Sequence, residues 1–348
     1  MKISFIRYSL LNRGGDRVVI EYANYLVDRG HEVKFYIDKF DTIFDINPSV
    51  ELNHIPLPTR IGTLLYGLIK DFDSDIVIVD IIHLSLFVGV RNNVIYLAQA
   101  HDTEYYKNRF VRLLIKMLYF IFLRLKKGCV ISDSEVLSKT LQDNYGATKV
   151  ITATTGIDMD KFYCDPDPDL VQQKGERKSI FILSRGDHYR KGFDITINVL
   201  KKLCVDFKDR LEVWVCGDEL YNNILPCTTR YLGSPEDNVM RRILSSADIF
   251  LYPSRYEGFG LFPLEAMACG CLVITTPAVP YVTDGYNAIV VPIGDDKGLV
   301  KKISETINSR IIDSRILHNA YETAKQFDIR KSKEKFEAAL LEVKKFYH

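Results

Sequence analysis

The chain alternates short apolar runs with longer segments in which apolar residues recur at helical spacing. The apolar runs predict strands at 2–7, 32–37, 76–80, 94–99 and 128–132, and again at 179–184, 211–216, 229–232, 248–252, 272–275 and 288–291. The amphipathic segments of the first half predict helices at 15–29, 61–71, 105–126 and 134–145, and further helices separate the later strands. Strands that alternate with helices are typical of parallel sheets covered on both faces. We therefore predict an α/β protein.

A break in this pattern divides the chain into two halves. Residues 165–178 combine prolines and charges without periodicity, which is typical of a linker. The chain has 348 residues, enough for roughly two domains of about 150 residues each. We predict doubly wound, Rossmann-like domains at 1–164 and 179–327. Because ligands bind outside the carboxyl ends of such strands, we expect a cleft between the two sheets.

One segment of the second half combines a predicted anion site with two carboxylates. It reads Glu257-Gly-Phe-Gly-Leu-Phe-Pro-Leu-Glu265 and follows a predicted strand. The amides of Phe259, Gly260 and Leu261 lie at the predicted start of a helix, where unpaired N–H groups and the helix dipole attract anions. Glu265 can accept hydrogen bonds from vicinal hydroxyls, and Glu257 from a second polyol. An anion, a diol and a sugar describe a nucleotide sugar, although two glutamates at this spacing can also be a solvated pair.

This segment resembles the signature of the retaining glycosyltransferases of family four, which have the GT-B fold of two Rossmann-like domains. The resemblance extends over essentially the whole chain. It implies that Glu257 contacts the donor sugar and that Glu265 contacts the ribose of the nucleotide. It also implies that the charged helical pattern at 328–348 crosses back to the first domain.

Two basic residues follow the first strand of the second half. Arg185 offers a planar fork and Lys191 a point charge, both of which suit a diphosphate. Taken alone, this segment is also typical of a basic surface loop. The family has an arginine and then Lys-Gly at this place, so the resemblance implies that Arg185 and Lys191 hold the pyrophosphate.

Three further places match the family in chain order. Gly14 and Gly15 let the backbone approach a ligand, although most glycine pairs after a strand are only turns. The resemblance places them near the donor phosphate. A lone histidine such as His101 is usually structural, but the resemblance implies that it lies beside the donor sugar. Ser234 matches the loop whose backbone contacts the base, which leaves UDP, GDP and ADP donors all open.

We expect neither a metal nor a cofactor. The pairs Asp73-Ser-Asp75 and Asp165-Pro-Asp167 are typical of solvated turns rather than of a metal site. Basic side chains and a helix dipole already supply positive charge to a leaving diphosphate. No full G-x-G-x-x-G motif follows the first strand, which disfavours a nicotinamide cofactor.

Composition adds expectations about partners and location. The net charge of +1 gives no general attraction to nucleic acid, and the seven cysteines lack zinc-site spacing, so we expect free thiols in the cytoplasm. The start of the chain reads as a strand rather than a signal peptide, and no apolar run has the length of a membrane span. Residues 105–127 contain seven basic residues and no acidic one, which is typical of a helix lying on anionic lipid at the inner face of a membrane. The alternative is a helix packed on its sheet with a solvated basic edge.

These observations predict an enzyme that transfers a sugar from a UDP- or GDP-linked donor to a glycan or lipid-linked acceptor. No carboxylate stands out as a nucleophile, so the resemblance implies retention by front-face departure, with His101, Glu257, Arg185 and Lys191 in the catalytic site. One alternative is a nucleotide-sugar epimerase or hydrolase of GT-B type. Another is a catalytically silent GT-B subunit, against which the intact glutamates and basic residues count.

Overall fold

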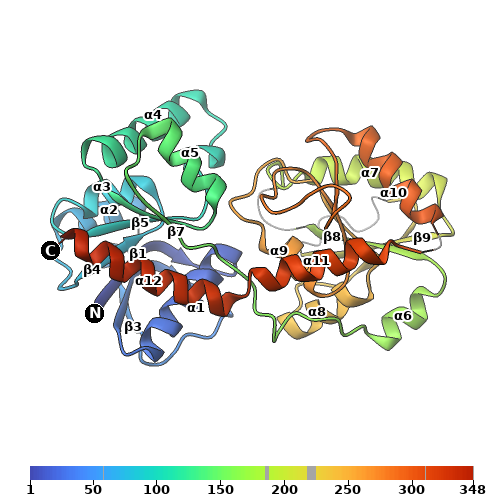
Figure 1. Cartoon of the computed structure of the whole chain (residues 1–348), viewed down its shortest axis with the longest axis horizontal. Helices are drawn as coiled ribbons and strands as arrows, with labels where there is room; N and C mark the ends of the chain where they lie inside the picture. Colours follow the sequence, from blue (N-terminus) through green and yellow to red (C-terminus); the bar gives the residue numbers. More distant parts are fainter. Residues whose placement is uncertain (58, 185–187, 218–224, 310, 348) are drawn as a thin grey trace. The chain divides into compact units, whose positions relative to one another are not determined.

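The computed structural model describes residues 1–57, 59–184, 188–217, 225–309 and 311–347 (Figure 1). The chain forms two compact units, one of Met1–Thr155 with Arg330–His348, and one of Gly156–Ile329. Each unit is built on one parallel sheet with helices packed against it, which confirms the predicted fold class.

The first unit contains a sheet in the order β3-β2-β1-β4-β5-β6-β7. Its strands are β1 (Lys2–Leu10), β2 (Glu32–Phe40), β3 (Glu51–His54), β4 (Ile76–Val79), β5 (Val94–Ala98), β6 (Cys129–Ser132) and β7 (Lys149–Thr152). Its helices are α1 (Gly14–Asp28), α2 (Arg60–Ile69), α3 (Ile82–Val88), the 3-10 turn η1 (Asp102–Tyr105), α4 (Arg109–Tyr119), the π-helical turn η2 (Phe120–Leu125), α5 (Glu135–Tyr145) and α12 (Ile329–Tyr347). Apolar side chains of α2, α3, α4 and α5 share one core with the central strands, including Val77 and Val79 of β4. All four residues of β4 are buried, as expected for a parallel strand covered on both faces.

The second unit contains a sheet in the order β10-β9-β8-β11-β12-β13. Its strands are β8 (Lys178–Ser184), β9 (Leu211–Gly217), β10 (Thr228–Tyr231), β11 (Ile249–Tyr252), β12 (Leu272–Thr275) and β13 (Ile289–Val290). Its helices are α6 (Pro168–Lys174), α7 (Phe193–Asp206), α8 (Asp237–Ser246), α9 (Leu261–Ala268), α10 (Asp296–Asn308) and α11 (Ser314–Gln326). One core holds α7 and α10 against the sheet, and a second core holds α8, α9 and α11 (Figure 1).

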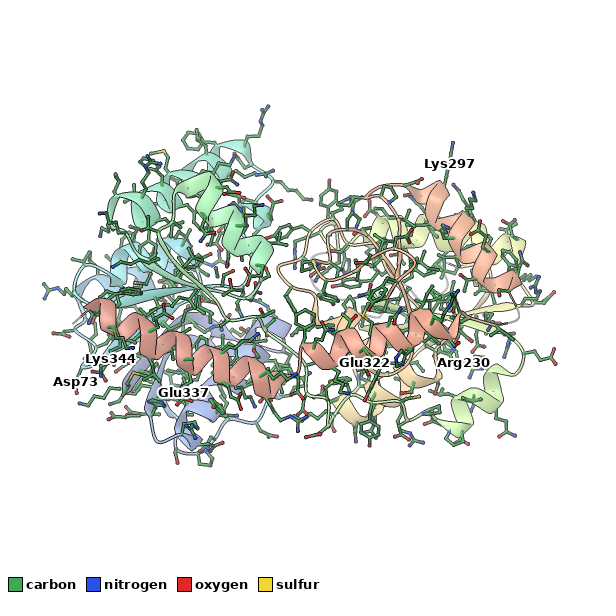
Figure 2. The ribbon with its side chains drawn as sticks, in the orientation of Figure 1. Asp73, Arg230, Lys297, Glu322, Glu337 and Lys344 are labelled. Carbon is green, nitrogen blue, oxygen red and sulfur yellow. A yellow bond between two sulfur atoms is a disulfide. The ribbon has the colours of Figure 1, made fainter. Side chains whose placement is uncertain are left out.

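The last helix packs on the first unit. Phe336 of α12 stacks on Tyr22 of α1 with ring centroids 4.0 Å apart, and the Tyr22 hydroxyl lies 2.7 Å from Ser332 Oγ. Glu337 and Lys344 project from the same helix (Figure 2), where Glu337 Oε1 lies 3.0 Å from His31 Nε2. The apolar stripe of this charged helix is therefore buried within the first unit.

The expected linker contains a helix. The Asp167 side chain accepts hydrogen bonds from the amides of Asp169 and Leu170, and Pro168 occupies the first turn of α6, where its missing N–H is harmless. Lys174 at the end of α6 forms an ion pair of 2.9 Å with Asp248. Pro168, one of the prolines that suggested a linker, therefore begins a helix. The two units divide between residues 155 and 156 rather than at 164.

Other differences arise where local pattern is weak. The polar edge strand β3 and the half-buried β7 have no long apolar run, so they were not expected. The helix expected at 105–126 is interrupted, because the side chain of Asn108 caps a new start at Arg109 and the last turn is π-helical.

The expectation of free thiols is wrong for two of the seven cysteines. Cys204 of α7 and Cys227 before β10 form a disulfide. Both side chains belong to the core on one face of the second sheet, where the fold brings together residues 23 positions apart. The other five cysteines have free thiols. The expectation of a cytoplasmic location, which partly depended on free thiols, therefore rests on these five.

Candidate active site

The strand order of the second sheet reverses between β8 and β11. These strands are hydrogen-bonded neighbours, with Ile249 opposite Ile180. The chain continues from β8 through α7 to β9 on one side, and from β11 through α9 to β12 on the other side. Ligands of doubly wound sheets bind beyond the carboxyl ends of the strands at such a reversal. The segments at this position are the loop that follows β8, described from residue 188, and the loop at 253–260.

An ion pair joins these two loops. Lys191 Nζ lies 2.8 Å from Glu257 Oε1 and 2.7 Å from Glu257 Oε2, and donates to the Tyr252 hydroxyl at 2.7 Å. The Ser254 hydroxyl donates to Glu257 Oε1 at 2.6 Å, and Arg190 Nη1 lies 3.9 Å from Glu257 Oε2. Glu257 is buried, so its carboxylate is held in one orientation.

This environment keeps Glu257 ionised. Burial acts to raise the pKa of its carboxyl, but the charges of Lys191 and Arg190 outweigh burial, so the pKa is lowered from its usual value. The neighbouring Tyr252 has a pKa raised well above its usual value, first by burial and then by the charge of Glu257. The site therefore presents a carboxylate and an ammonium side by side, with a neutral phenol beside them.

Two helices begin at this place, each after a glycine with positive φ. Gly192 precedes α7 with φ of 69°, and a Cβ there would lie 2.0 Å from the carbonyl oxygen of Pro253. Gly260 precedes α9 with φ of 89°, and its carbonyl accepts a hydrogen bond from the Tyr281 hydroxyl. Neither glycine supplies a side-chain cap, so the first-turn amides of α9 are suited to bind an anion.

The other residues predicted for donor binding in the second unit have different surroundings. The Phe259 ring packs against Tyr281 and Phe327, so its side chain has a structural role and only its amide is suited to the ligand. Glu265 is buried on α9, and Ser234 is exposed in the loop after β10. Arg185 lies outside the described residues.

Gly14 and Gly15 lie at the carboxyl end of β1, where the order of the first sheet reverses toward β4. Gln99 Nε2 donates to the Gly15 carbonyl at 3.0 Å, and a Cβ on Gly15 would lie 3.0 Å from Gln99 Oε1. The glycine therefore allows close contact with the end of β5. Its predicted role near the donor phosphate stays a prediction.

His101 is buried in an aromatic cluster of the first unit. Its ring packs against both Tyr119 and Tyr145, at centroid distances of 4.9 and 5.6 Å, and these two tyrosine rings also stack on each other at 4.9 Å. Nδ1 lies 2.5 Å from Thr103 Oγ1, and Nε2 lies 3.0 Å from the Tyr145 hydroxyl. Burial lowers the pKa of the imidazole to about 4, so it is neutral at pH 7. A sugar contact through either nitrogen requires one of these hydroxyls to move, and the predicted role stays a prediction.

Asp102, next to His101, is expected to make stability depend on pH. Burial raises the pKa of its carboxyl to about 7, although it accepts hydrogen bonds from the Ile82 amide at 2.8 Å and the Tyr96 hydroxyl at 3.0 Å. Because the folded pKa exceeds the unfolded value, this group favours folding below pH 7 and loses that contribution as pH rises through 7. Between pH 5.5 and pH 8 the loss is about 2 kcal/mol.

The Asp102→Asn variant keeps an acceptor for Ile82 and cannot ionise. We expect its free energy of unfolding in urea, minus that of the unaltered protein, to be about 2 kcal/mol larger at pH 8 than at pH 5.5. His101 titrates in both proteins, so its effect cancels in the difference. A difference that does not change with pH contradicts the assignment.

Sequence reasoning missed three residues around Glu257, namely Arg190, Tyr252 and Ser254. Arg190 Nη1 also donates to the Tyr256 carbonyl at 3.2 Å, which ties the two loops together. The one feature of the sequence that pointed to Arg190 was its position next to Lys191. A tyrosine at a strand end and a serine after proline have no distinctive pattern.

The two Asp-x-Asp pairs make structural contacts. Asp73 forms an ion pair with Lys2 at 2.8 Å, and Asp75 accepts a hydrogen bond from the Lys2 amide at 2.9 Å. Asp165 pairs with Arg241 at 2.8 Å, and Asp167 caps α6. Within the described residues, no group of three or more His, Cys, Asp or Glu side chains is placed to hold a metal ion.

Curated proteins match parts of the chain. A phosphatidyl-myo-inositol mannosyltransferase of Propionibacterium freudenreichii is 32% identical over 149 residues, covering 42% of this chain and 36% of that protein. The GPI3 subunit of the phosphatidylinositol N-acetylglucosaminyltransferase of Saccharomyces cerevisiae is 27% identical over 175 residues, covering 46% of this chain and 38% of that protein. The chain thus spans less than half the length of these two relatives.

Solved structures match over nearly the whole chain. Sucrose-phosphate synthase of Thermosynechococcus elongatus superposes with a TM-score of 0.78 at 16% identity, covering 99% of both chains. HepE of Anabaena, in complex with UDP-glucose, superposes with a TM-score of 0.76 at 18% identity, covering 98% of this chain and all of that one (100%). At this identity the likeness shows the fold, which is GT-B.

Two family models cover most of the sequence. The model of glycosyltransferase family 4 matches residues 12–161, and the model of glycosyl transferases group 1 matches residues 177–309. The first match lies almost entirely in the first unit, and the second match lies in the second unit. The chain therefore belongs to the family four, or group 1, glycosyltransferases.

Proposed function

We propose that the chain transfers a sugar from a nucleotide-sugar donor to a glycan or lipid-linked acceptor, with retention at the anomeric carbon. The observation that carries the proposal is the contact between Lys191 and Glu257 beside the start of α9. A cation that binds phosphate oxygens and a carboxylate that binds sugar hydroxyls are adjacent here, as the two sides of a glycosyl–phosphate bond require.

The proposed mechanism uses these groups to stabilise the leaving diphosphate. Lys191 turns from Glu257 toward the β-phosphate, and the first amides of α9 donate to the same group, so that negative charge developing on the diphosphate is stabilised. Arg185 is proposed as a further cation for this group. Glu257, held by Ser254, accepts hydrogen bonds from the sugar and orients its anomeric carbon.

Retention follows from the proposal that the acceptor attacks on the face from which the diphosphate leaves. The bond from the anomeric carbon to the phosphate oxygen breaks, the bond to the acceptor oxygen forms, and the leaving diphosphate takes the acceptor proton. Glu265 is proposed to bind the ribose hydroxyls, and Ser234 to lie at the base. The relatives named for phosphatidylinositol lipids support a lipid-linked acceptor.

Proton NMR of UDP- and GDP-sugars with the purified chain tests this function. A transferase leaves the donor largely intact until an acceptor is added, and the new anomeric signal then keeps the configuration of the donor. Sugar release or epimerisation without acceptor supports the rival enzyme, and no change with any donor and acceptor supports a silent subunit. A screen for thermal stabilisation first identifies the donor, because a ligand that binds only the folded state raises its apparent stability.

We also expect transfer to continue in excess EDTA. In the proposed site, positive charge comes from Lys191, Arg185 and the start of α9, whereas the Asp-x-Asp pairs bind basic side chains or cap a helix. The check is the initial rate with and without chelator, followed by added magnesium or manganese. Complete loss with EDTA and recovery with either metal contradicts the prediction.

A further inference from the structure

One helix of the first unit has an apolar face that the described residues leave uncovered. Phe110, Leu113 and Met117 of α4 are 75%, 57% and 53% exposed. Leu114 and Phe120 are exposed as well, and together these five side chains have the spacing of one helical stripe. The opposite side of the helix is buried through Ile115 and Tyr119. The helix is therefore already packed on its sheet, and the outer stripe adds nothing to that core.

Exposed basic side chains lie in the same segment as this stripe. Arg109, Lys116, Arg124, Lys126 and Lys127 are exposed in the same segment. The nearest acidic residue before it, Glu104, is engaged by Arg112 at 3.1 Å. Residues 105–127 contain no acidic residue, so their positive charge is not balanced within the segment.

The combination selects one kind of partner. A second copy of the chain docked through the same face would bring two basic segments together, which is unfavourable. A surface that is apolar at its centre and anionic around it satisfies both features, and an anionic lipid bilayer provides them. Among the described residues no helix has the length and apolar character needed to cross a bilayer. A helix of 11 residues is only about 16 Å long and can lie in the interface plane.

We propose that the outer face of α4 and η2 docks on an anionic lipid bilayer, with Phe110, Leu113, Leu114, Met117 and Phe120 entering the headgroup region and the basic side chains contacting lipid phosphates. The proposal does not depend on the transfer reaction, because it uses none of the residues placed in the candidate active site.

Co-sedimentation of the full chain with vesicles tests the proposal. The vesicles are phosphatidylcholine alone or with about 30% phosphatidylglycerol, at low salt and at about 0.5 M salt. We expect binding only with phosphatidylglycerol, and weaker binding at high salt. Protein that stays in the supernatant with anionic vesicles at low salt overturns the proposal.

Matched variants locate the contact. The triple variant Arg109→Gln, Lys116→Gln and Lys126→Gln is expected to bind anionic vesicles at least about tenfold more weakly. Its control removes the same charge from exposed lysines of the second unit, as Lys201→Gln, Lys297→Gln and Lys301→Gln, and should bind normally (Lys297 is labelled in Figure 2). If both triple variants lose vesicle binding equally, the attraction is due to overall charge, and the proposed docking surface is wrong.

A second pair of variants tests the apolar stripe. Phe110→Ser with Met117→Ser should lower binding at least about tenfold, whereas Val205→Ser with Ile311→Ser, at exposed positions of the second unit, should not. Sedimentation velocity without lipid is measured in parallel. A dimer that the first pair dissociates, without vesicle binding, assigns the face to a second copy and overturns the proposal.

Discussion

Replacing Lys191 with methionine is expected to lower kcat/KM for transfer at least about 100-fold, the scale of removing one group that stabilises developing charge. Glu257→Gln is expected to have a comparable effect, because the amide binds sugar hydroxyls with altered polarity. Arg185→Ala is expected to act like the lysine variant.

Removing one partner of a buried ion pair also costs stability, so activity alone does not establish the role of Lys191. Without the ammonium, the buried Glu257 carboxylate loses two contacts of 2.7 and 2.8 Å, which is expected to cost roughly 3 kcal/mol. The double variant Lys191→Met with Glu257→Gln removes both charges. Its free energy of unfolding should recover toward that of the unaltered protein, while its transfer rate should not.

The measurements are kcat/KM, unfolding in urea and calorimetric titration with the nucleoside diphosphate. We expect Lys191→Met to weaken diphosphate binding and Glu257→Gln to change it little, because of these two side chains the lysine is proposed to contact phosphate and the glutamate to contact the sugar. Folded single variants with unaltered transfer rates contradict the proposed site.

Replacing Gly192 with alanine is expected to disrupt both the fold of the loop and donor binding. A side chain costs about 1 kcal/mol or more at φ of 69°, and the added Cβ would lie 2.0 Å from the carbonyl oxygen of Pro253. One of the two loops must move, which separates Lys191 from Glu257. We expect a loss of roughly 3 kcal/mol in stability and at least a tenfold loss in affinity for the nucleoside diphosphate.

Gly294 supplies the control for backbone strain. Its φ is 83°, but nothing lies within 4 Å of a Cβ built there. Gly294→Ala should therefore lose only about 1 kcal/mol and bind nucleoside diphosphate normally. If the two variants lose equal stability and equal affinity, contact between the loops does not position the site.

Local sequence determined most of the elements, although not the strands β3 and β7 or the helix α6. The run Ile76–Val79 is apolar at every position because both faces of a parallel strand are buried, and it could be recognised without the structure. Gly260 and the helix after it could be placed as well, because a glycine loop between a strand and a helical pattern has few other conformations. The α/β class followed from these elements, whereas the strand order and its reversal beside the candidate site are known only from the tertiary structure.

Long-range contacts decided the rest. Lys191 and Glu257 are 66 positions apart, and only the pairing of β8 with β11 makes them an ion pair. His101 was predicted at a strand end, but whether its nitrogens face a ligand or two hydroxyls depends on helices that follow it in the chain. Likewise, the apolar residues of α4 form two faces in the sequence, and packing buried only one of them. Periodicity shows which residues share a face, whereas burial depends on what the tertiary structure places against it.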